Sequence, residues 1–259
     1  MSASTDIHLT KAGAVIFLTL NRPAKKNALT LAMWDAIPEL LAQAADMQGA
    51  RALVVRGEGG VFAAGADIAE FETTYATPEA ALANHMRIQA AMTALESFPL
   101  PTLAMIEGAC VGGGCGLALC CDLRFAASTA RFGITPAKLG LVYGVADTRR
   151  LVQAVGLSAA KDILFSGRLM DAAEAHRLGL VDRVVSPEAL AGETQAYVDA
   201  LAHASSFSAK ATKAILARLR EGQTEDDDAS RALFASAFSG PDFQEGFAAF
   251  QQKRSPHFD

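Results

Sequence analysis

Two stretches rich in small residues decide the fold: FAAGADI at residues 62–68 and GGGCG at residues 112–116. Because these side chains are short, backbone N–H groups in both stretches can approach a ligand closely. The second stretch opens the apolar run 117–121, which predicts a buried helix. The first N–H groups of such a helix are free donors at the positive end of its dipole. Two backbone donors directed at one oxygen atom would form an oxyanion hole.

Further motifs lie on both sides of these stretches. They are NRP at 21–23, NAL at 27–29, EGACVGGGCGLALCCD at 107–122, FGITPAKLGL at 132–141, AHRLGLVD at 175–182 and FAAFQQKRSPHF at 247–258. In this order and over almost the whole chain, they resemble the enoyl-CoA hydratase/isomerase (crotonase) superfamily. The resemblance implies an α/β fold, a spiral of repeated β-β-α units, followed by a C-terminal helical region that forms trimers, often paired into hexamers.

The hydrophobic pattern independently predicts an α/β fold. Apolar runs predict strands at 14–20, 52–55, 100–106 and 122–126, which alternate with helices at 29–47, 78–98 and 113–121. From Pro187 onward the pattern is helical, with amphipathic helices expected at 208–220, 226–238 and 241–253. We therefore expect a core at 1–200 that binds acyl-CoA and a helical oligomerisation region at 201–259.

One detail of the helix expected at 78–98 can be checked directly. Its periodicity predicts that Leu82, Met86, Met92 and Leu95 share one face.

Composition excludes several classes of protein. The 259 residues are 51% hydrophobic and 20% charged, as in an ordinary soluble globular protein. The net charge of −5 provides no basic field for nucleic acid or anionic membranes. No apolar run reaches the roughly 18 residues that span a membrane, and the N-terminus shows no secretory signal. We expect a cytoplasmic protein.

The four cysteines, Cys110, Cys115, Cys120 and Cys121, lie close together in the chain. They lack the spacing and histidine partners of a metal site, and a disulfide framework would spread them more widely. We interpret them as small apolar residues of a buried strand–helix unit, and expect no metal. Reduced thiols suit the cytoplasm.

Two nucleotide-binding motifs are also excluded. The G-x-G-x-x-G spacing fails because Leu117 stands where the last glycine should fall, and no G-K-[ST] ending of a P-loop is present.

The resemblance assigns site residues one by one. The backbone amides of Ala66 and Gly113 would form the oxyanion hole and stabilise an enolate on a thioester oxygen. The alternative is that both runs only permit tight packing or a turn.

Coenzyme A enters as part of the substrate, with no tightly bound cofactor. Its contacts would come from Lys25, Lys26, Ala28, Ala64, Asp67, Ile68, Phe250 and Lys253. Lys25 and Lys26 would lie near the phosphates; the alternative is that they are only solvated. Phe250 and Lys253 would reach the ligand of a neighbouring subunit; the alternative for Phe250 is packing between helices.

The chain departs from the family at its acid–base positions. Hydratases carry one glutamate in a GGGxE arrangement and a second after FGxP, and here these positions are Gly116 and Pro136. Water addition to an enoyl thioester needs a group that activates water and one that delivers a proton. The usual two-glutamate mechanism is therefore unsupported.

Tyr143 is the best remaining polar candidate, and His85 and Tyr75 are weaker ones. The pattern TPxxLGxxY that ends at Tyr143 resembles methylmalonyl-CoA decarboxylases, although Ala66 stands where those enzymes place a histidine. Tyr143 could instead pack in the pocket wall, and His85 could be an ordinary helix-face histidine. Asp147 is expected to pair with Arg149 or Arg150.

Three functions remain open. The first is an enoyl-CoA hydratase/isomerase-family enzyme that acts on an acyl-CoA through a stabilised enolate. The second is a decarboxylase of a malonyl-type CoA, in which loss of carbon dioxide generates the enolate without a base. The third is a non-catalytic acyl-CoA-binding protein.

Overall fold

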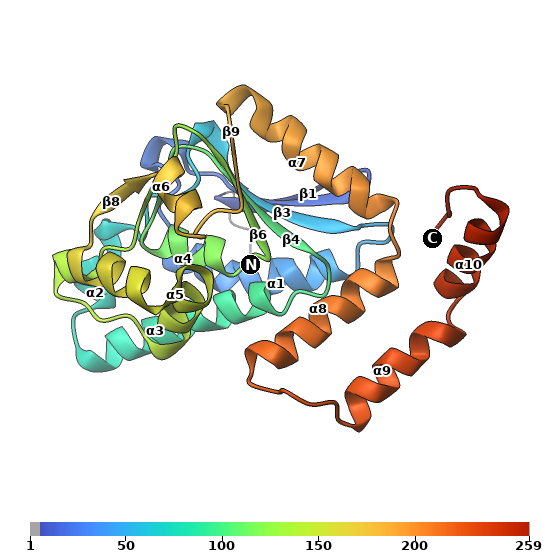
Figure 1. Cartoon of the computed structure of the whole chain (residues 1–259). Helices are drawn as coiled ribbons and strands as arrows, with labels where there is room; N and C mark the ends of the chain where they lie inside the picture. The colour runs from blue at the N-terminus through green and yellow to red at the C-terminus, as the bar shows by residue number, and fades with distance from the viewer. Residues whose placement is uncertain (1–5, 259) are drawn as a thin grey trace.

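A computed structural model of the chain describes residues 6–258, and a six-stranded sheet forms its centre (Figure 1). The strand order is β1-β2-β3-β4-β6-β9, in which only β1 runs antiparallel to its neighbour. The strands are Ile7–Ala12 (β1), Val15–Leu20 (β2), Ala52–Gly57 (β3), Thr102–Ile106 (β4), Leu123–Ala127 (β6) and Arg183–Val185 (β9). The predicted α/β fold is confirmed, as are the four predicted strands.

A second, three-stranded sheet lies beside the first, in the order β5-β7-β8. Its strands are Ala109–Val111 (β5), Arg131–Gly133 (β7) and Leu169–Asp171 (β8). The hydrophobic pattern did not predict these strands, because three residues are too few to show alternation.

Helices cover both faces of the main sheet. Leu31–Ala45 (α1), Pro78–Glu96 (α3) and Gly113–Leu119 (α4) lie on one face, while Pro187–Ala202 (α7) crosses the other (Figure 1). Strand alternation explains the two layers: Ile16 and Leu18 of β2 point into the cluster under α1, whereas Val15 joins the cluster under α7. Three further helices complete the core: Phe71–Thr74 (α2), Val145–Ser166 (α5) and Ala172–Arg177 (α6).

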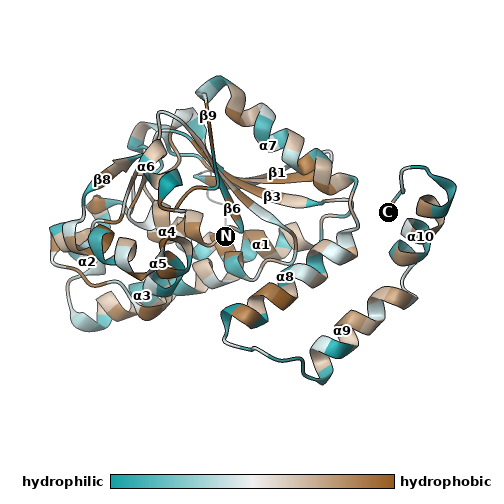
Figure 2. Cartoon of the chain, in the orientation of Figure 1, coloured by the Kyte–Doolittle hydropathy of each residue, from teal (hydrophilic) through white to brown (hydrophobic). Residues whose placement is uncertain are grey.

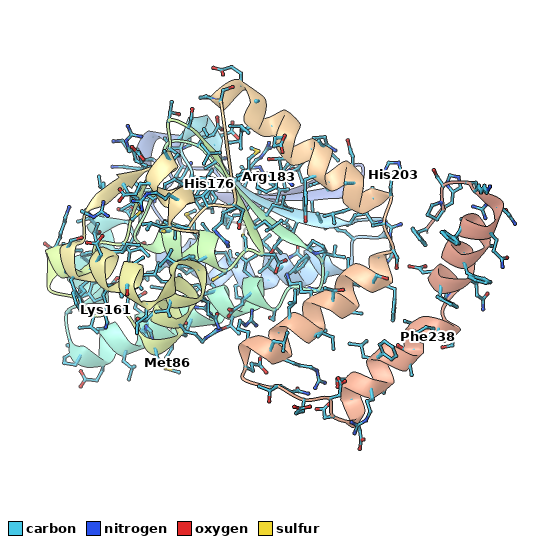
Figure 3. All side chains as sticks on the ribbon, viewed as in Figure 1. Met86, Lys161, His176, Arg183, His203 and Phe238 are labelled. Carbon is cyan, nitrogen blue, oxygen red and sulfur yellow. The ribbon has the colours of Figure 1, made fainter. Side chains whose placement is uncertain are left out.

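The C-terminal helices form an arm that extends from the core (Figure 1). They are Ser206–Arg220 (α8), Asp228–Ser239 (α9) and Pro241–Gln252 (α10), and they confirm the three helices predicted from periodicity. The arm carries hydrophobic residues, as Figure 2 shows, and Figure 3 labels Phe238 on α9. Six of its phenylalanines are exposed: Phe207, Phe234, Phe238, Phe243, Phe247 and Phe250.

The prediction for the face of α3 is wrong. Met92 and Leu95 are buried, but Leu82 is 60% and Met86 65% exposed, and Figure 3 labels Met86 on this helix. At about 100° per residue, Leu82 and Met86 lie on the side of the helix opposite Leu95. The buried face is instead formed by Asn84, Ala91, Met92 and Leu95.

The cysteine interpretation is confirmed, since all four thiols are free and buried. Burial raises the pKa of Cys120 to about 12, so this thiol stays protonated and unreactive. In residues 6–258, no three His, Cys, Asp or Glu side chains are grouped to hold a metal ion. None of the helices in that range has the length and apolar character to cross a bilayer.

Candidate functional site

The two small-residue stretches lie against each other. A Cβ atom added to Gly65 would come within 3.3 Å of the Val111 carbonyl oxygen, and one added to Gly112 within 3.7 Å of the Gly65 Cα atom. Both glycines have positive φ, 109° and 54°, which favours glycine. Two hydrogen bonds join the first stretch to β5, the strand that leads into the second. Ala63 N–H donates to the Ala109 carbonyl (2.9 Å), and Val111 N–H donates to the Ala63 carbonyl (2.9 Å).

Two backbone donors in these stretches are unused. Within residues 6–258, no acceptor is recorded for the N–H groups of Ala66 and Gly113, although their neighbours Asp67 and Gly112 donate to Leu29 (2.9 Å) and Gly133 (2.8 Å). Gly113 is the first residue of α4, whose N-terminal N–H groups are not used within the helix. Both residues line the same cavity.

The other glycines of the second stretch permit close packing. A Cβ atom on Gly114 would lie 2.6 Å from the Ala63 Cβ atom, which leaves no room for a side chain. A Cβ atom on Gly116 would lie 2.6 Å from the Met92 methyl group. Met92 therefore occupies the space into which a side chain at position 116 would extend.

The cavity has a volume of about 700 Å³ and is enclosed by α2, α3, the loop before α5 and the two small-residue stretches. Much of its wall is apolar, including Trp34, Phe71, Ala81, Ile88 and Met92. An apolar cavity with a few polar groups is typical of small-molecule binding sites.

Loop 22–28 is joined to the first stretch. Arg22 forms an ion pair with Asp67 (2.8 Å) and donates to the Ala28 carbonyl (2.6 Å), while Ala64 N–H donates to the Lys26 carbonyl (2.9 Å). The hydrogen bond from Arg22 holds the pKa of the Asp67 carboxyl below its usual value.

Six of the residues assigned to coenzyme A are thus brought together, namely Lys25, Lys26, Ala28, Ala64, Asp67 and Ile68. The other two, Phe250 and Lys253, lie at the far end of the arm (Figure 1). Their role at a neighbouring subunit's ligand stays a prediction.

Five titratable side chains line the cavity: Tyr75, His85, Lys138, Tyr143 and Asp147. Burial raises the pKa of the Tyr143 phenol, which therefore remains protonated at neutral pH. His85 is exposed at the rim, and its ring packs on Gly144, where an added Cβ atom would lie 2.6 Å from Cε1. Gly116 and Pro136 also line the cavity, and neither has a side chain that can act as an acid or a base.

Asp147 lies near the start of α5 with its side chain only 11% exposed. Its Oδ2 atom accepts a hydrogen bond from Gln89 (2.8 Å), and its Oδ1 atom accepts one from Arg150 (3.4 Å). The predicted pairing is confirmed for Arg150. Among the described residues that line the cavity, Asp147 is the only carboxylate.

Sequence reasoning assigned no role to three polar residues of the cavity, Thr135, Lys138 and Asn84 of α3. The sequence did contain a signal for Asn84, because it lies inside a predicted helix. Asparagine is unfavourable there, since its side chain competes with the backbone for hydrogen bonds.

Comparisons with known proteins agree with this architecture. The family profile described as enoyl-CoA hydratase/isomerase matches residues 10–259. The chain is 37% identical over 243 residues to a probable enoyl-CoA hydratase of Mycobacterium tuberculosis, which covers 93% of each chain. It is 34% identical over 261 residues to a crotonyl-CoA hydratase of Syntrophomonas wolfei, which covers 99% of this chain and 98% of that protein.

Among solved structures, a putative enoyl-CoA hydratase/isomerase family protein from Hyphomonas neptunium superposes with a TM-score of 0.96 at 45% identity, covering 100% of this chain and 99% of the other. An enoyl-CoA hydratase/carnithine racemase from Magnetospirillum magneticum gives 0.94 at 36% identity, with 99% and 96% covered. Because the profile and these relatives span nearly the whole chain, the protein belongs to the enoyl-CoA hydratase/isomerase family.

Proposed function

We propose that this protein is an enzyme that acts on an acyl-CoA thioester, with the N–H groups of Ala66 and Gly113 stabilising an enolate oxygen. One observation carries the proposal: contact between Gly65 and Gly112 brings two unused backbone donors to one cavity. Donors fixed before the reaction stabilise developing negative charge without reorganisation, which is the basis of an oxyanion hole.

Coenzyme A would bind along loop 22–28 and the 62–68 stretch. Lys25 and Lys26 supply positive charge for its phosphates. The Lys26 side chain starts from a left-handed backbone with φ of 50°, in a turn that buried Asn27 fixes through bonds to the carbonyls of Glu58 (2.9 Å) and Val61 (2.5 Å). This turn fixes the backbone from which the two exposed lysine side chains extend, and the Lys26 carbonyl accepts a hydrogen bond from Ala64 N–H.

Proton transfer must differ from that of a two-glutamate hydratase. Gly116 and Pro136 have no ionisable group, and Met92 fills the space beside position 116. We assign proton transfer to the remaining cavity groups: neutral Tyr143 as a proton donor, and Asp147 or His85 as a base. Neither group stands at the position of a hydratase glutamate, which predicts slow hydration.

Decarboxylation of a malonyl-type CoA is the second candidate. The observation that favours it is that Met92 occupies the space beside Gly116. No base can therefore extend into the cavity from position 116. Decarboxylation generates the enolate by loss of carbon dioxide, and then requires only an oxyanion hole and a proton donor such as Tyr143.

We expect crotonyl-CoA hydration to be slow relative to two-glutamate relatives. Each acid–base group typically contributes about 10²–10⁴-fold, so the loss of both lowers kcat strongly. The measurement is kcat with crotonyl-CoA, beside carbon dioxide release from methylmalonyl-CoA, for the wild type and the variants Tyr143→Phe, Asp147→Asn and His85→Gln.

The outcomes separate the candidates. A wild-type kcat near about 10³ s⁻¹, at the upper end of the usual enzyme range, would contradict slow hydration. Negligible hydration with carbon dioxide release that Tyr143→Phe impairs identifies the decarboxylase. Tight acyl-CoA binding without either reaction identifies a non-catalytic binding protein.

We infer that the protein assembles into trimers or hexamers in the cytoplasm. The arm exposes a row of aromatic rings, in which Phe234, Phe238 and Phe243 make edge contacts at 5.2 Å and 5.3 Å. Exposed apolar patches of this kind are typical of protein interfaces. Sedimentation at micromolar concentration is expected to give a mass of at least three chains of 27.1 kDa.

The matched test of assembly is Phe238→Asp, which places a charge in this row and should release monomers. Sedimentation of the wild type as a monomer, or a stable and active protein that lacks residues 208–259, would contradict the assembly.

A further inference from the structure

Gly144 is a glycine that its own helix does not require. It is the N-cap of α5, where the side chain of a serine or an aspartate would accept hydrogen bonds from the first turn. Its φ of −66° and ψ of 166° are open to any residue. Neither capping nor backbone conformation therefore explains the missing side chain.

The side chain of His85 explains it. A Cβ atom added to Gly144 would lie 2.6 Å from His85 Cε1 and 3.1 Å from His85 Nε2, so the imidazole of α3 packs directly on the start of α5. The same added atom would lie 3.6 Å from the Asp147 Oδ2 atom. The small residue thus brings the edge of an imidazole and a carboxylate oxygen to one place.

Other residues hold the Asp147 carboxylate in this orientation. Gln89, one helical turn after His85 on α3, donates to Oδ2 (2.8 Å), and Arg150 donates to Oδ1 (3.4 Å). Arg150 also pairs with Glu96 at a shorter distance (2.9 Å), so its charge is divided between two carboxylates. Asp147 lies in the first turn of α5, where the helix dipole stabilises negative charge. The carboxylate is therefore fixed beside His85.

The pair lies in the cavity of the proposed oxyanion hole. His85 and Asp147 both line this cavity. Their helices, α3 and α5, both pack against α4, whose first residue is Gly113. A group that can exchange a proton and a donor that can stabilise an oxygen therefore face the same space.

Of the polar side chains that α3 contributes to the cavity wall, only that of His85 is accessible. Asn84 is 6% exposed and donates to the Tyr75 hydroxyl (3.3 Å). Its Oδ1 atom has no partner within residues 6–258, but the protein encloses this atom and keeps it from a ligand. His85 is exposed.

Exposure also separates the roles of the two members of the pair. The Asp147 side chain is only 11% exposed, and both of its oxygens accept hydrogen bonds, from Gln89 and Arg150. An accessible imidazole can take a proton from a substrate. A fixed carboxylate beside it orients the ring and stabilises the imidazolium that forms.

We propose that His85 is the base of this enzyme and that Asp147 is its positioning residue, with Gly144 allowing the two to meet. The proposal rests on the proposed acyl-CoA function and assigns the base, for which both side chains are candidates. His85 takes a proton from the α-carbon of the acyl group. The electron pair of the broken C–H bond forms the enolate, whose negative charge lies in the oxyanion hole. The imidazolium, stabilised by Asp147, returns the proton in the reverse step.

Exchange of the α-protons of butyryl-CoA in deuterium oxide, followed by NMR with the full-length protein, measures this step alone. His85→Gln should slow the exchange by about 10²-fold or more, the usual contribution of a general base. Asp147→Asn should slow it by about tenfold, because the imidazolium loses its counter-charge. The double variant should be no slower than His85→Gln, since Asp147 acts only through His85. The Kd of butyryl-CoA, measured by calorimetry, should stay within about twofold of the wild-type value.

Gly144→Ala tests the geometry by adding one methyl group where the imidazole packs. Alanine adopts the same backbone, so the fold should survive while the His85 ring is displaced. Exchange should fall about as far as in His85→Gln. Gly192→Ala in α7 is the matched control, because a Cβ atom added there meets no neighbouring group within 4 Å. It should leave the exchange rate unchanged.

Several results would overturn the pair. They are losses that multiply in the double variant, exchange that His85→Gln or Asp147→Asn leaves unchanged, and a folded Gly144→Ala that keeps the wild-type rate. The comparison of single and double variants decides even if Gly144→Ala fails to fold.

The wild type separates failure of the pair from failure of the proposed function. Binding of butyryl-CoA without any exchange overturns the base and leaves decarboxylation, which needs none, as the reaction. Failure of every CoA thioester to bind overturns the acyl-CoA function, and the pair with it.

Discussion

Replacing Gly113 with proline is expected to lower turnover of the acyl-CoA substrate by about 10²–10³-fold, the usual effect of removing one oxyanion-hole donor. Proline lacks the N–H group that we assign to the enolate oxygen. The fold should survive, because Gly113 is the first residue of α4, where helices tolerate proline. Steady-state kinetics on the folded variant, with circular dichroism to verify the fold, measures the loss.

Gly113→Ala separates the missing donor from steric crowding. A Cβ atom at this position lies 3.2 Å from Trp34 Cζ2 and 3.7 Å from Leu29 Cδ1, so both substitutions press on the same neighbours. Alanine, however, keeps the N–H group. We expect the alanine variant to retain most of the activity. Equal losses in the two variants would show that crowding, not the donor, matters, and an active proline variant would disprove the oxyanion hole.

Replacing Glu96 with glutamine is expected to destabilise the protein by about 3–5 kcal/mol, the range for breaking a buried ion pair by removing one partner. Glu96 is the last residue of α3. Its carboxylate forms ion pairs with three arginines: Arg150 (2.9 Å) and Arg149 (3.2 Å) of α5 and Arg220 (3.2 Å) of α8. The Arg150 side chain is 3% exposed. Without the carboxylate, the buried Arg150 charge would keep the longer ion pair with Asp147 (3.4 Å) and would lie beside the charges of two further arginines.

The effect should depend on pH. Burial alone would raise the pKa of Glu96, but the hydrogen bond and charge of Arg150, with Arg220 and Arg149, lower it overall. A lowered pKa stabilises the folded state above the unfolded value of about 4.3, and this stabilisation is lost as the pH falls through the folded value. The wild type and Glu96→Gln should therefore differ most at neutral pH and converge in acid.

Urea unfolding at neutral and acidic pH measures both effects. Glu39→Gln provides the control, since Glu39 is an exposed carboxylate of α1 and its replacement should change the free energy of unfolding by less than about 0.5 kcal/mol. If the Glu96 variant is as stable as this control, the buried cluster does not contribute to stability.

The family and the main elements could be read from the sequence, because they depend on local patterns. Apolar runs specified β2, β3, β4 and β6, and the 3.6-residue period specified the three arm helices. The small-residue stretches at 62–68 and 112–116 identified the site, since glycine there allows close backbone approach. The absence of carboxylates at Gly116 and Pro136 is likewise visible in the chain itself.

Only the tertiary structure decided how these parts combine. The contact between Gly65 and Gly112, the Met92 methyl beside Gly116 and the ion pairs of Glu96 join segments far apart in sequence. Local periodicity has no information about such neighbours. The unpaired oxygen of Asn84 likewise emerged only when α2 and α3 were seen to enclose one cavity. The error over Leu82 and Met86 is different, because helical geometry at about 100° per residue already puts them opposite Leu95.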